Sequence, residues 1–381
     1  MNKLIVLQTL LILGRNPTIS IAEIWARFPS AKICAREKEF AVFENISTPD
    51  LKKIGGVVKT GKVFSQCFQP SLKEKDLQVI YAFLEKEFSQ KSGKQIFAFS
   101  VYPFDLRILK TLLIGSKKFL KKKKISSRFA NKNFSNLTNA QSEFEVLKKG
   151  GVEILVAKGK QGWFFAKLEQ NQPFESYKKR DYEKAFRDAR VGMLPPKLAQ
   201  IMVNLGVGDA ATSCLGNPRV YDPFCGAGGV LVEAALMGYE ALGSDIDPRM
   251  VDFSQKNLAA LNLQGEVFSH DAKQKISQKY DVVVSEGYLG PPRRTIPDPQ
   301  VCVKIFKELQ QLYESFFAWV ECRRVVICFP VYLEGGKPKH FASEEILPAL
   351  AKLGWKMKNT EKLIYSRENQ TVGREIVILS R

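Results

Sequence analysis

A strand, a glycine turn and a helix follow one another over residues 220–235, and this segment constrains the fold more than any other. Residues 221–224 supply the end of a buried strand. Gly226, Gly228 and Gly229 then allow the backbone to turn tightly, with no side chain projecting toward a ligand. The segment is therefore typical of a nucleotide-cofactor loop in a Rossmann-like α/β domain.

The residues around this turn discriminate between cofactors. A dinucleotide-binding loop would carry its third glycine at position 231, where this chain has Leu231. Asp222, four residues before the first glycine, would place a carboxylate where a pyrophosphate has to sit. A carboxylate suits instead a cationic sulfonium cofactor that carries an amino group. The loop therefore favours S-adenosylmethionine over NAD.

Two further acids follow the next predicted strands. Asp245 ends the strand predicted at 240–245, where a carboxylate can accept hydrogen bonds from both ribose hydroxyls. Asp271 follows the strand predicted at 265–269, where it can meet the adenine amine. Because ligands of open α/β sheets lie outside the carboxyl ends of the strands, these acids are expected to share one cleft with Asp222. The alternative for any single acid is a turn or cap role.

Net charge indicates the kind of partner. The chain has 381 residues, enough for two or three domains, and its 45% of apolar residues supports ordinary cores. Its net charge of +19 implies a polyanionic partner, and nucleic acid is favoured over a membrane surface.

The apolar run at 4–13 is too short to span a membrane, and we expect a buried first strand there.

Cysteine and histidine usage excludes other classes. The seven cysteines include no C-x-x-C pair and the chain has two histidines, so we expect no metal site. Two histidines also argue against a hydrolase that depends on a positioned imidazole. Unpaired cysteines are typical of reduced thiols, which predicts a cytoplasmic protein.

The chain divides into two halves of different pattern. From residue 193 onward, strands and helices alternate regularly, which predicts a doubly wound sheet. Strands are predicted there at 219–223, 240–245, 265–269, 280–285, 324–330, 361–365 and 374–379.

The first half reads as two α+β blocks followed by a polar segment. The first block has a strand at 4–13, a helix at 20–28 and short elements predicted at 40–43, 50–54 and 57–64. The second has helices at 75–90 and 104–120 and strands at 95–101, 125–129, 153–158 and 162–168. We therefore predict domains at 1–66, 67–168 and 191–381, with a linker at 169–190.

One lysine run stands out in the second block. Six of the eight residues 117–124 are lysine, and Arg128 follows. Lysines crowded at a helix end favour contacts with nucleic-acid phosphates, which give affinity without recognising the base sequence. The alternative is a solvated helix end whose lysines complement the helix dipole. With the overall charge, we predict RNA contacts from Lys117, Lys118, Lys121, Lys122, Lys123, Lys124 and Arg128.

Several segments besides the glycine loop carry a resemblance to a known family: those at 14–24, 55–59, 99–102 and 177–183, the lysine run with Ser127 and Arg128, and the stretch 192–205. Over nearly its whole length the chain resembles the THUMP-containing tRNA guanosine N2-methyltransferases, the group that includes the position-10 enzymes of archaea and eukaryotes. This resemblance implies an N-terminal ferredoxin-like domain, a THUMP RNA-binding domain and a Rossmann-like class I methyltransferase domain. It also implies tRNA as partner, and leaves open a small activating subunit, as in some relatives.

The resemblance implies cofactor roles for particular residues. Leu194 and Pro195 would lie beside the methionine moiety, and Asp222, Gly226 and Gly228 would surround its amino acid end. Asp245 would bind the ribose and Asp271 would lie near the adenine. We add the neighbouring Cys225 and Ile246 to the predicted cofactor-binding positions.

The chain departs from the family in the loop after the strand at 280–285. Family members carry Asp or Asn, then Pro-Pro, then an aromatic residue, whereas this chain has Glu286, Gly287, Tyr288 and Leu289. Methylation of an exocyclic amine needs acceptors for its N–H groups and a face on which the extruded base stacks. Glu286 and the Gly287 carbonyl can accept hydrogen bonds, and Tyr288 either stacks on the base or packs into the sheet edge. Phe186 is a second departure, because the family tends to have proline there.

Three functions remain once this resemblance and its departures are considered. The first is an S-adenosylmethionine-dependent methyltransferase acting on the exocyclic N2 amine of a guanosine in tRNA, with Glu286, Gly287, Tyr288 and Leu289 as the catalytic loop. The second is an RNA-binding protein that keeps the cofactor fold but has lost or altered transfer chemistry. A DNA amine methyltransferase ranks third, because the THUMP-like half argues for RNA.

Overall fold

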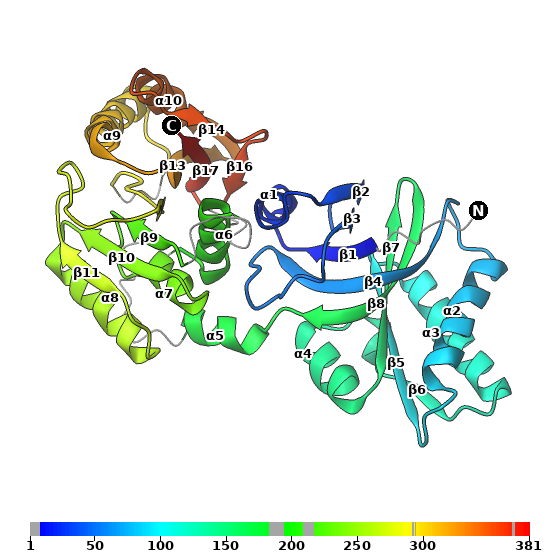
Figure 1. The fold of residues 1–381 in the computed structure, drawn as a ribbon. Coiled ribbons are helices and arrows are strands. Elements are labelled where there is room, and N and C mark those ends of the chain that lie inside the picture. The colour runs from blue at the N-terminus through cyan, green and yellow to red at the C-terminus, as the bar shows by residue number, and fades with distance from the viewer. Residues whose placement is uncertain (1–7, 183–193, 209–216, 292, 294, 368–369) are drawn as a thin grey trace. The chain divides into compact units, whose positions relative to one another are not determined.

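The computed structural model describes residues 8–182, 194–208, 217–291, 293, 295–367 and 370–381 (Figure 1). The chain forms two compact units: residues 1–17 with 30–175, and residues 18–29 with 176–381. Phe186 and residues 183–190 of the predicted linker lie outside the described residues. Among the described residues, no helix combines the length and apolarity that crossing a membrane requires.

A mixed sheet forms the centre of the first unit. Over the described residues it has eight strands in the order β2-β3-β1-β4-β8-β7-β5-β6. The strands are β1 (Gln8–Leu13), β2 (Lys32–Arg36), β3 (Phe40–Glu44), β4 (Val57–Cys67), β5 (Gln95–Tyr102), β6 (Ser127–Phe129), β7 (Val152–Gly159) and β8 (Gly162–Asn171). The helices are α2 (Glu74–Phe88), α3 (Leu106–Lys122) and the short α4 (Asn139–Gln141).

The two predicted N-terminal blocks share this sheet, because β4 from the first pairs with β8 from the second. A buried ion pair also joins them: Lys59 Nζ lies 2.6 Å from Glu153 Oε1 and donates to Ser142 Oγ at 2.7 Å. Ser100 Oγ donates to the same carboxylate oxygen at 2.7 Å. Sequence patterning gave no sign of this pairing. The ferredoxin-like and THUMP assignments within the unit stay predictions.

The observed elements differ from the predicted ones in several places. Strand β2 was not predicted, because its residues alternate little in polarity and stay largely exposed. The segment at 50–54 forms a turn instead of a regular element. The polar segment predicted as linker contains a helix, α5 (Phe174–Tyr182).

The second unit is a doubly wound sheet, as its βα alternation predicts. Its described strands run in the order β11-β10-β9-β12-β13-β17-β15, with β14 on β13 and β16 on β17. The strands are β9 (Arg219–Asp222), β10 (Glu240–Asp245), β11 (Glu266–Ser269), β12 (Val282–Ser285), β13 (Arg324–Glu334), β14 (Lys337–Phe341), β15 (Lys356–Met357), β16 (Leu363–Tyr365) and β17 (Val372–Ser380). Strands β9 to β13 are parallel, and β17 is antiparallel to β13.

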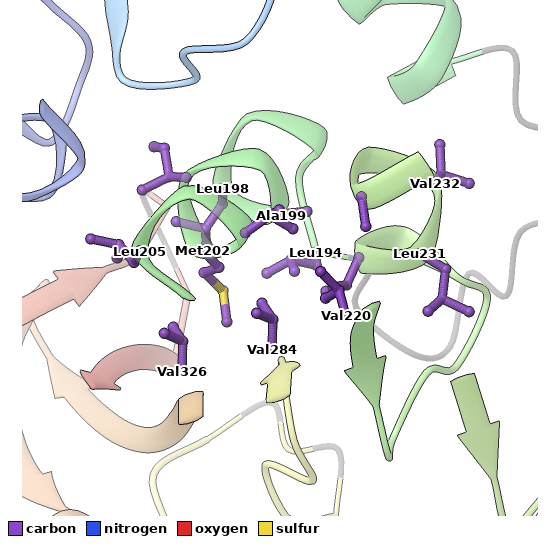
Figure 2. Close-up of a cluster of buried hydrophobic side chains, with 14 of the residues drawn as sticks. Leu194, Leu198, Ala199, Met202, Leu205, Val220, Leu231, Val232, Val284 and Val326 are labelled. Carbon is purple, nitrogen blue, oxygen red and sulfur yellow. The ribbon is translucent and has the colours of Figure 1, made fainter. Parts of the chain in front are cut away.

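Helices cover both faces of this sheet. They are α1 (Pro17–Arg27), α5, α6 (Pro196–Val207), α7 (Gly229–Leu236), α8 (Pro248–Ala260), α9 (Pro299–Trp319) and α10 (Ser343–Lys352). One core joins α6 and α7 to the sheet, with Met202 packed near Val284 and Val326 (Figure 2). A second core joins α9 and α10 to the opposite face through aromatic side chains such as Tyr313 and Phe316. The hairpin of β13 and β14 was not predicted.

The strand order reverses between β9 and β12. Strands β10 and β11 extend the sheet on one side of β9, whereas β12 and β13 extend it on the other. In open α/β sheets ligands bind outside the carboxyl ends of the strands at such a reversal. Asp222 ends β9 and Ser285 ends β12. The topology therefore predicts a ligand site at the loops that follow these two residues.

Candidate active site

A cavity of about 560 Å³ lies at this reversal, within the second unit. Its wall includes the three acids predicted from sequence: Asp222, Asp245 and Asp271. It also includes Glu286 and Tyr288 from the loop after β12. The cavity thus brings the predicted cofactor-binding acids together with the loop that departs from the family pattern.

Asp222, the last residue of β9, is part of the cavity wall. The side chain is buried, and its Oδ1 accepts from Ser285 Oγ at 2.6 Å and from the Phe224 N–H at 3.1 Å. The Gly287 N–H donates in turn to Ser285 Oγ at 3.0 Å. Burial raises the pKa of Asp222 to about 7. Ser285, which the sequence did not single out, therefore connects the acid of β9 to the loop after β12.

The glycine turn and Asp245 support each other. Asp245 Oδ2 accepts from the Gly226 N–H at 2.9 Å, and Oδ1 accepts from the Asp247 N–H at 3.0 Å. Burial raises the pKa of Asp245. Gly226 has a φ of +51°, and a Cβ built there would meet nothing within 4 Å, so its backbone faces open space. The turn therefore presents bare backbone to the cavity beside a fixed carboxylate.

The other predicted cofactor positions divide into two groups. Leu194, Cys225, Ile246 and Asp271 contribute to the cavity wall. Pro195 and Gly228 do not: Pro195 is the N-cap of α6, and Gly228 precedes α7 with a φ of +79°. A Cβ on Gly228 would lie 2.9 Å from Ser254 Oγ, so this glycine permits close packing of α7 against α8.

Glu286 is paired with an arginine that the sequence analysis missed. Arg374 Nε donates to Glu286 Oε1 at 2.5 Å, and the arginine side chain is only 6% exposed. Arg374 lies in β17, between the buried Gly373 and Glu375. Two adjacent charged residues, Arg374 and Glu375, at the start of an apolar predicted strand were the available signal, since buried charges are normally paired.

The conformation of the loop depends on glycine at 287. Gly287 has a φ of +68°, which proline, locked near −65°, is unable to adopt. A Cβ at this position would also lie 2.5 Å from the hydroxyl of Tyr313. That hydroxyl donates to the Tyr288 carbonyl at 2.9 Å. The loop is therefore fixed by Tyr313 of α9 in a shape that a Pro-Pro sequence would not take.

The two remaining loop residues have different positions. Tyr288 is 48% exposed and forms part of the cavity wall, so its ring is not packed into the sheet edge. Leu289 is partly buried and packs against the core on the α6 face. Of the alternatives for Tyr288, the structure therefore favours a side chain available to a ligand.

The segment that enters the second unit is anchored by a buried ion pair. Arg180 Nη1 lies 2.8 Å from Glu233 Oε2, with side-chain exposures of 8% and 1%. The guanidinium also lies 4.2 Å from the ring centroid of Tyr177, whose hydroxyl donates to Gln200. These contacts hold α5 against α6 and α7, so part of the predicted linker is an ordered element of the second unit.

The predicted RNA-binding lysines lie in the first unit, at the end of α3. Lys117, Lys118, Lys121 and Lys122 are exposed on its last turns, and Lys123 and Lys124 follow them. Lys123 Nζ lies 3.0 Å from Glu85 Oε1, so this residue has a structural partner. Arg128 is half-buried in β6. The run is therefore an exposed basic helix end, compatible with either alternative from sequence.

The strand order, the cavity at the reversal and the acids around it define the second unit as a class I methyltransferase fold. Residues 184–292 match the family described as RMKL-like, methyltransferase domain. The fold of the whole chain resembles the crystal structure of TrmN from Thermus thermophilus, with a TM-score of 0.51 and 14% identity. That likeness covers 98% of this chain and 99% of the other.

Curated relatives carry a more particular description. The tRNA (guanine(10)-N2)-dimethyltransferase of Methanothermobacter thermautotrophicus is 34% identical over 145 residues, which are 38% of this chain and 40% of that protein. The protein of the same name from Methanocaldococcus jannaschii is 28% identical over 241 residues, 61% of this chain and 64% of the relative. The chain spans about half the length of the curated relatives it matches. These similarities confirm the resemblance to tRNA guanosine N2-methyltransferases over the matched residues, and the THUMP domain stays a prediction.

Proposed function

We propose that the protein is an S-adenosylmethionine-dependent methyltransferase that acts in the cytoplasm on the exocyclic N2 amine of a guanosine in tRNA. The observation that carries the proposal is the cavity at the strand reversal, which joins Asp222 and Asp245 to Glu286 and Tyr288. The names of the curated relatives support the choice of guanine N2.

The residues of the cavity fit the cofactor. Asp245 would hold the ribose hydroxyls, Asp271 would lie near the adenine, and Asp222 would face the amino group. The bare backbone at Gly226 gives the amino acid end room to approach, since no side chain stands there. When bound, the cofactor supplies an electrophilic methyl group on its sulfonium.

The loop after β12 supplies groups for the amine. Glu286 would accept a hydrogen bond from the target N–H, which orients the nitrogen and directs its lone pair toward the methyl group. The Gly287 carbonyl would be a second acceptor. The exposed ring of Tyr288 offers a stacking face for a base flipped out of its helix. The loop thus retains each kind of group that the chemistry needs, although its sequence differs from the family pattern.

One observation favours the binding-only alternative. Glu286 already accepts a charge-assisted hydrogen bond from Arg374, which occupies part of its accepting capacity. A carboxylate has about four lone-pair sites, and the bond from Arg374 uses one of them. Incubation with labelled S-adenosylmethionine and unmodified tRNA separates the two functions. Transfer of label supports the methyltransferase, whereas binding of both ligands without transfer supports the alternative.

Asp245→Ala is expected to weaken binding of S-adenosylmethionine by about 1–3 kcal/mol, because it removes an acceptor and leaves the Gly226 N–H unpaired. Calorimetry without RNA measures this loss. Asp252→Ala is the control, because Asp252 is an exposed acid of α8 that pairs with Lys256. Equal affinity of the Asp245 variant and the wild type would show that the ribose position is wrongly assigned.

Asp222 predicts a pH dependence of cofactor binding. The pKa of Asp222 is raised by burial from 3.8 to about 7, whereas the cationic amino group favours its ionised form. Affinity should therefore fall as the pH drops below about 7, by up to about tenfold per unit, with a proton released on binding. Calorimetry in buffers of different ionisation enthalpy measures that proton. A wild-type pH profile matching that of Asp222→Asn would contradict the assignment.

The same shift affects stability in the opposite direction. Between pH 3.8 and about 7 the folded state of the cofactor-free protein holds a proton on Asp222 that the unfolded state has lost. The contribution of Asp222 to stability is therefore present at low pH and declines as the pH rises through this window. This decline should be absent in Asp222→Asn.

The lysine run is expected to contribute to tRNA affinity through phosphate contacts. Replacing Lys118, Lys121 and Lys122 by alanine should reduce the slope of log affinity against log salt by up to about three units. The control replaces the exposed Lys352, Lys356 and Lys358 of the second unit, which lowers the net charge equally. Slopes that fall alike in both triple variants would show that the run is only a solvated helix end.

A further inference from the structure

The buried Arg374 pairs with the half-buried Glu286 at the edge of the cavity, and this pair restricts which residue types can function at position 286. We propose that Arg374 is a positioning residue that makes a carboxylate, and not an amide, necessary at position 286 for methyl transfer. The inference rests on the proposed function, because it assigns Glu286 as the acceptor for the target amine.

Because Arg374 is buried, loss of its partner is energetically costly. The residue lies within β17, where it pairs in register with Pro330 of β13 and Tyr365 of β16. Its side chain is 6% exposed and that of Glu286 is 21% exposed, so the pair is largely out of water. Removing one partner of a buried ion pair leaves an uncompensated charge, which is strongly destabilising. Arg374 therefore requires an acceptor beside it.

The hydrogen-bonding capacities of the two groups determine which side chain at position 286 can bind both Arg374 and the target amine. A guanidinium has donors only, so whatever faces Arg374 has to accept. A carboxylate has two accepting oxygens and can serve Arg374 with one side while it accepts from the target amine with the other. Glu286 has this capacity, because it contacts Arg374 through Oε1 and also lines the cavity.

Glutamine has the same shape but a different capacity. Its amide has one accepting oxygen, and its NH2 group only donates. Beside Arg374 the amide oxygen would face the guanidinium, because the opposite orientation would place the amide NH2 group, a donor, next to the guanidinium N–H donors. The NH2 group would then face the cavity, where the target N–H also donates. Glu286→Gln should thus be as inactive as Glu286→Ala, although an unconstrained amide would be able to turn its oxygen to the amine.

A set of four proteins tests this: wild type, Glu286→Gln, Arg374→Met, and the double variant. Single-turnover transfer to unmodified tRNA is measured with saturating cofactor, together with both ligand affinities. Glu286→Gln should transfer about 1000-fold more slowly than wild type, with affinities changed by no more than about threefold. The double variant should recover at least about tenfold over Glu286→Gln, because the amide oxygen is released from the arginine.

Glu375→Gln is the matched control. Glu375 is the next residue of β17, is buried, and accepts from Ser343 Oγ at 2.5 Å, but does not line the cavity. Its transfer rate should stay within about threefold of wild type. A purely structural role of Arg374 would not produce recovery in the double variant, since removing the arginine only adds to any loss of stability.

The outcomes separate this inference from the proposed function. Active wild type with a Glu286→Gln rate within about tenfold overturns the inference alone, as does a double variant no faster than Glu286→Gln. If Arg374→Met does not fold, Glu286→Gln decides by itself, because its oxygen still pairs with Arg374. Wild type that transfers to no tRNA overturns the proposed function, and the inference with it.

Discussion

Glu286→Ala is expected to abolish methyl transfer while leaving the affinities for S-adenosylmethionine and tRNA within a few fold of wild type. In the proposed function, the acceptor interaction of Glu286 would be made mainly with the reacting geometry, so its loss should appear in turnover more than in binding. A reduction of at least about 1000-fold in single-turnover rate corresponds to about 4 kcal/mol of transition-state stabilisation. Labelled transfer under single-turnover conditions measures it.

The stability of this variant has to be measured alongside its rate, because Arg374 loses its partner. Breaking a buried pair commonly costs about 3–5 kcal/mol, so rates are compared well below the midpoint of thermal unfolding. Tyr288→Ala serves as a graded comparison, since loss of a stacking face should cost only about 1–3 kcal/mol. Full activity in Glu286→Ala would mean that the acceptor lies elsewhere and that the loop is wrongly assigned.

Arg180→Ala is expected to destabilise the second unit by about 3–5 kcal/mol, because it leaves the buried Glu233 carboxylate without its arginine. It also removes the guanidinium from the face of Tyr177. Urea unfolding, followed by fluorescence and circular dichroism, measures the free energy of unfolding. Lys178→Ala is the control, because Lys178 is exposed on the same helix.

A loss below about 1 kcal/mol in Arg180→Ala would show that the ion pair contributes as little as an exposed one. A large loss would establish that α5 stabilises the second unit. It would also explain why the segment at 177–183 resembles relatives although it lies outside the glycine loop. Helix α5 would then be a structural part of the second unit and not a passive connection.

The parts of the fold that the sequence predicted are those determined by local patterns. The strand predicted at 240–245 is β10, and the glycine turn lies where the spacing of Gly226 and Gly228 places it. Both follow from short-range rules, namely an apolar run bounded by turn residues and glycines with positive φ. The acids at the strand ends then converge because parallel strands share one edge.

The parts that the sequence did not predict depend on contacts between distant residues. Arg374 meets Glu286 across 88 positions, and Tyr313 supports Tyr288 across 25. The periodicity of apolar residues along the sequence gives no information about such long-range pairs. Helix α5 was missed because its sequence is mostly polar and shows no apolar periodicity. The packing of Tyr177 and Arg180, which stabilises the helix, is visible only in the structure. Marginal helices of this length owe their stability to tertiary packing more than to propensity.

Identifying the modified nucleoside tests the central claim most directly. The purified protein is incubated with labelled S-adenosylmethionine and unmodified tRNA, the tRNA is digested to nucleosides, and the labelled product is resolved by mass spectrometry. We expect label in N2-methylguanosine or N2,N2-dimethylguanosine, and none when Glu286→Ala replaces the wild type. Label in a methylated adenosine or cytidine, or no label despite binding of both ligands, would contradict the proposed function.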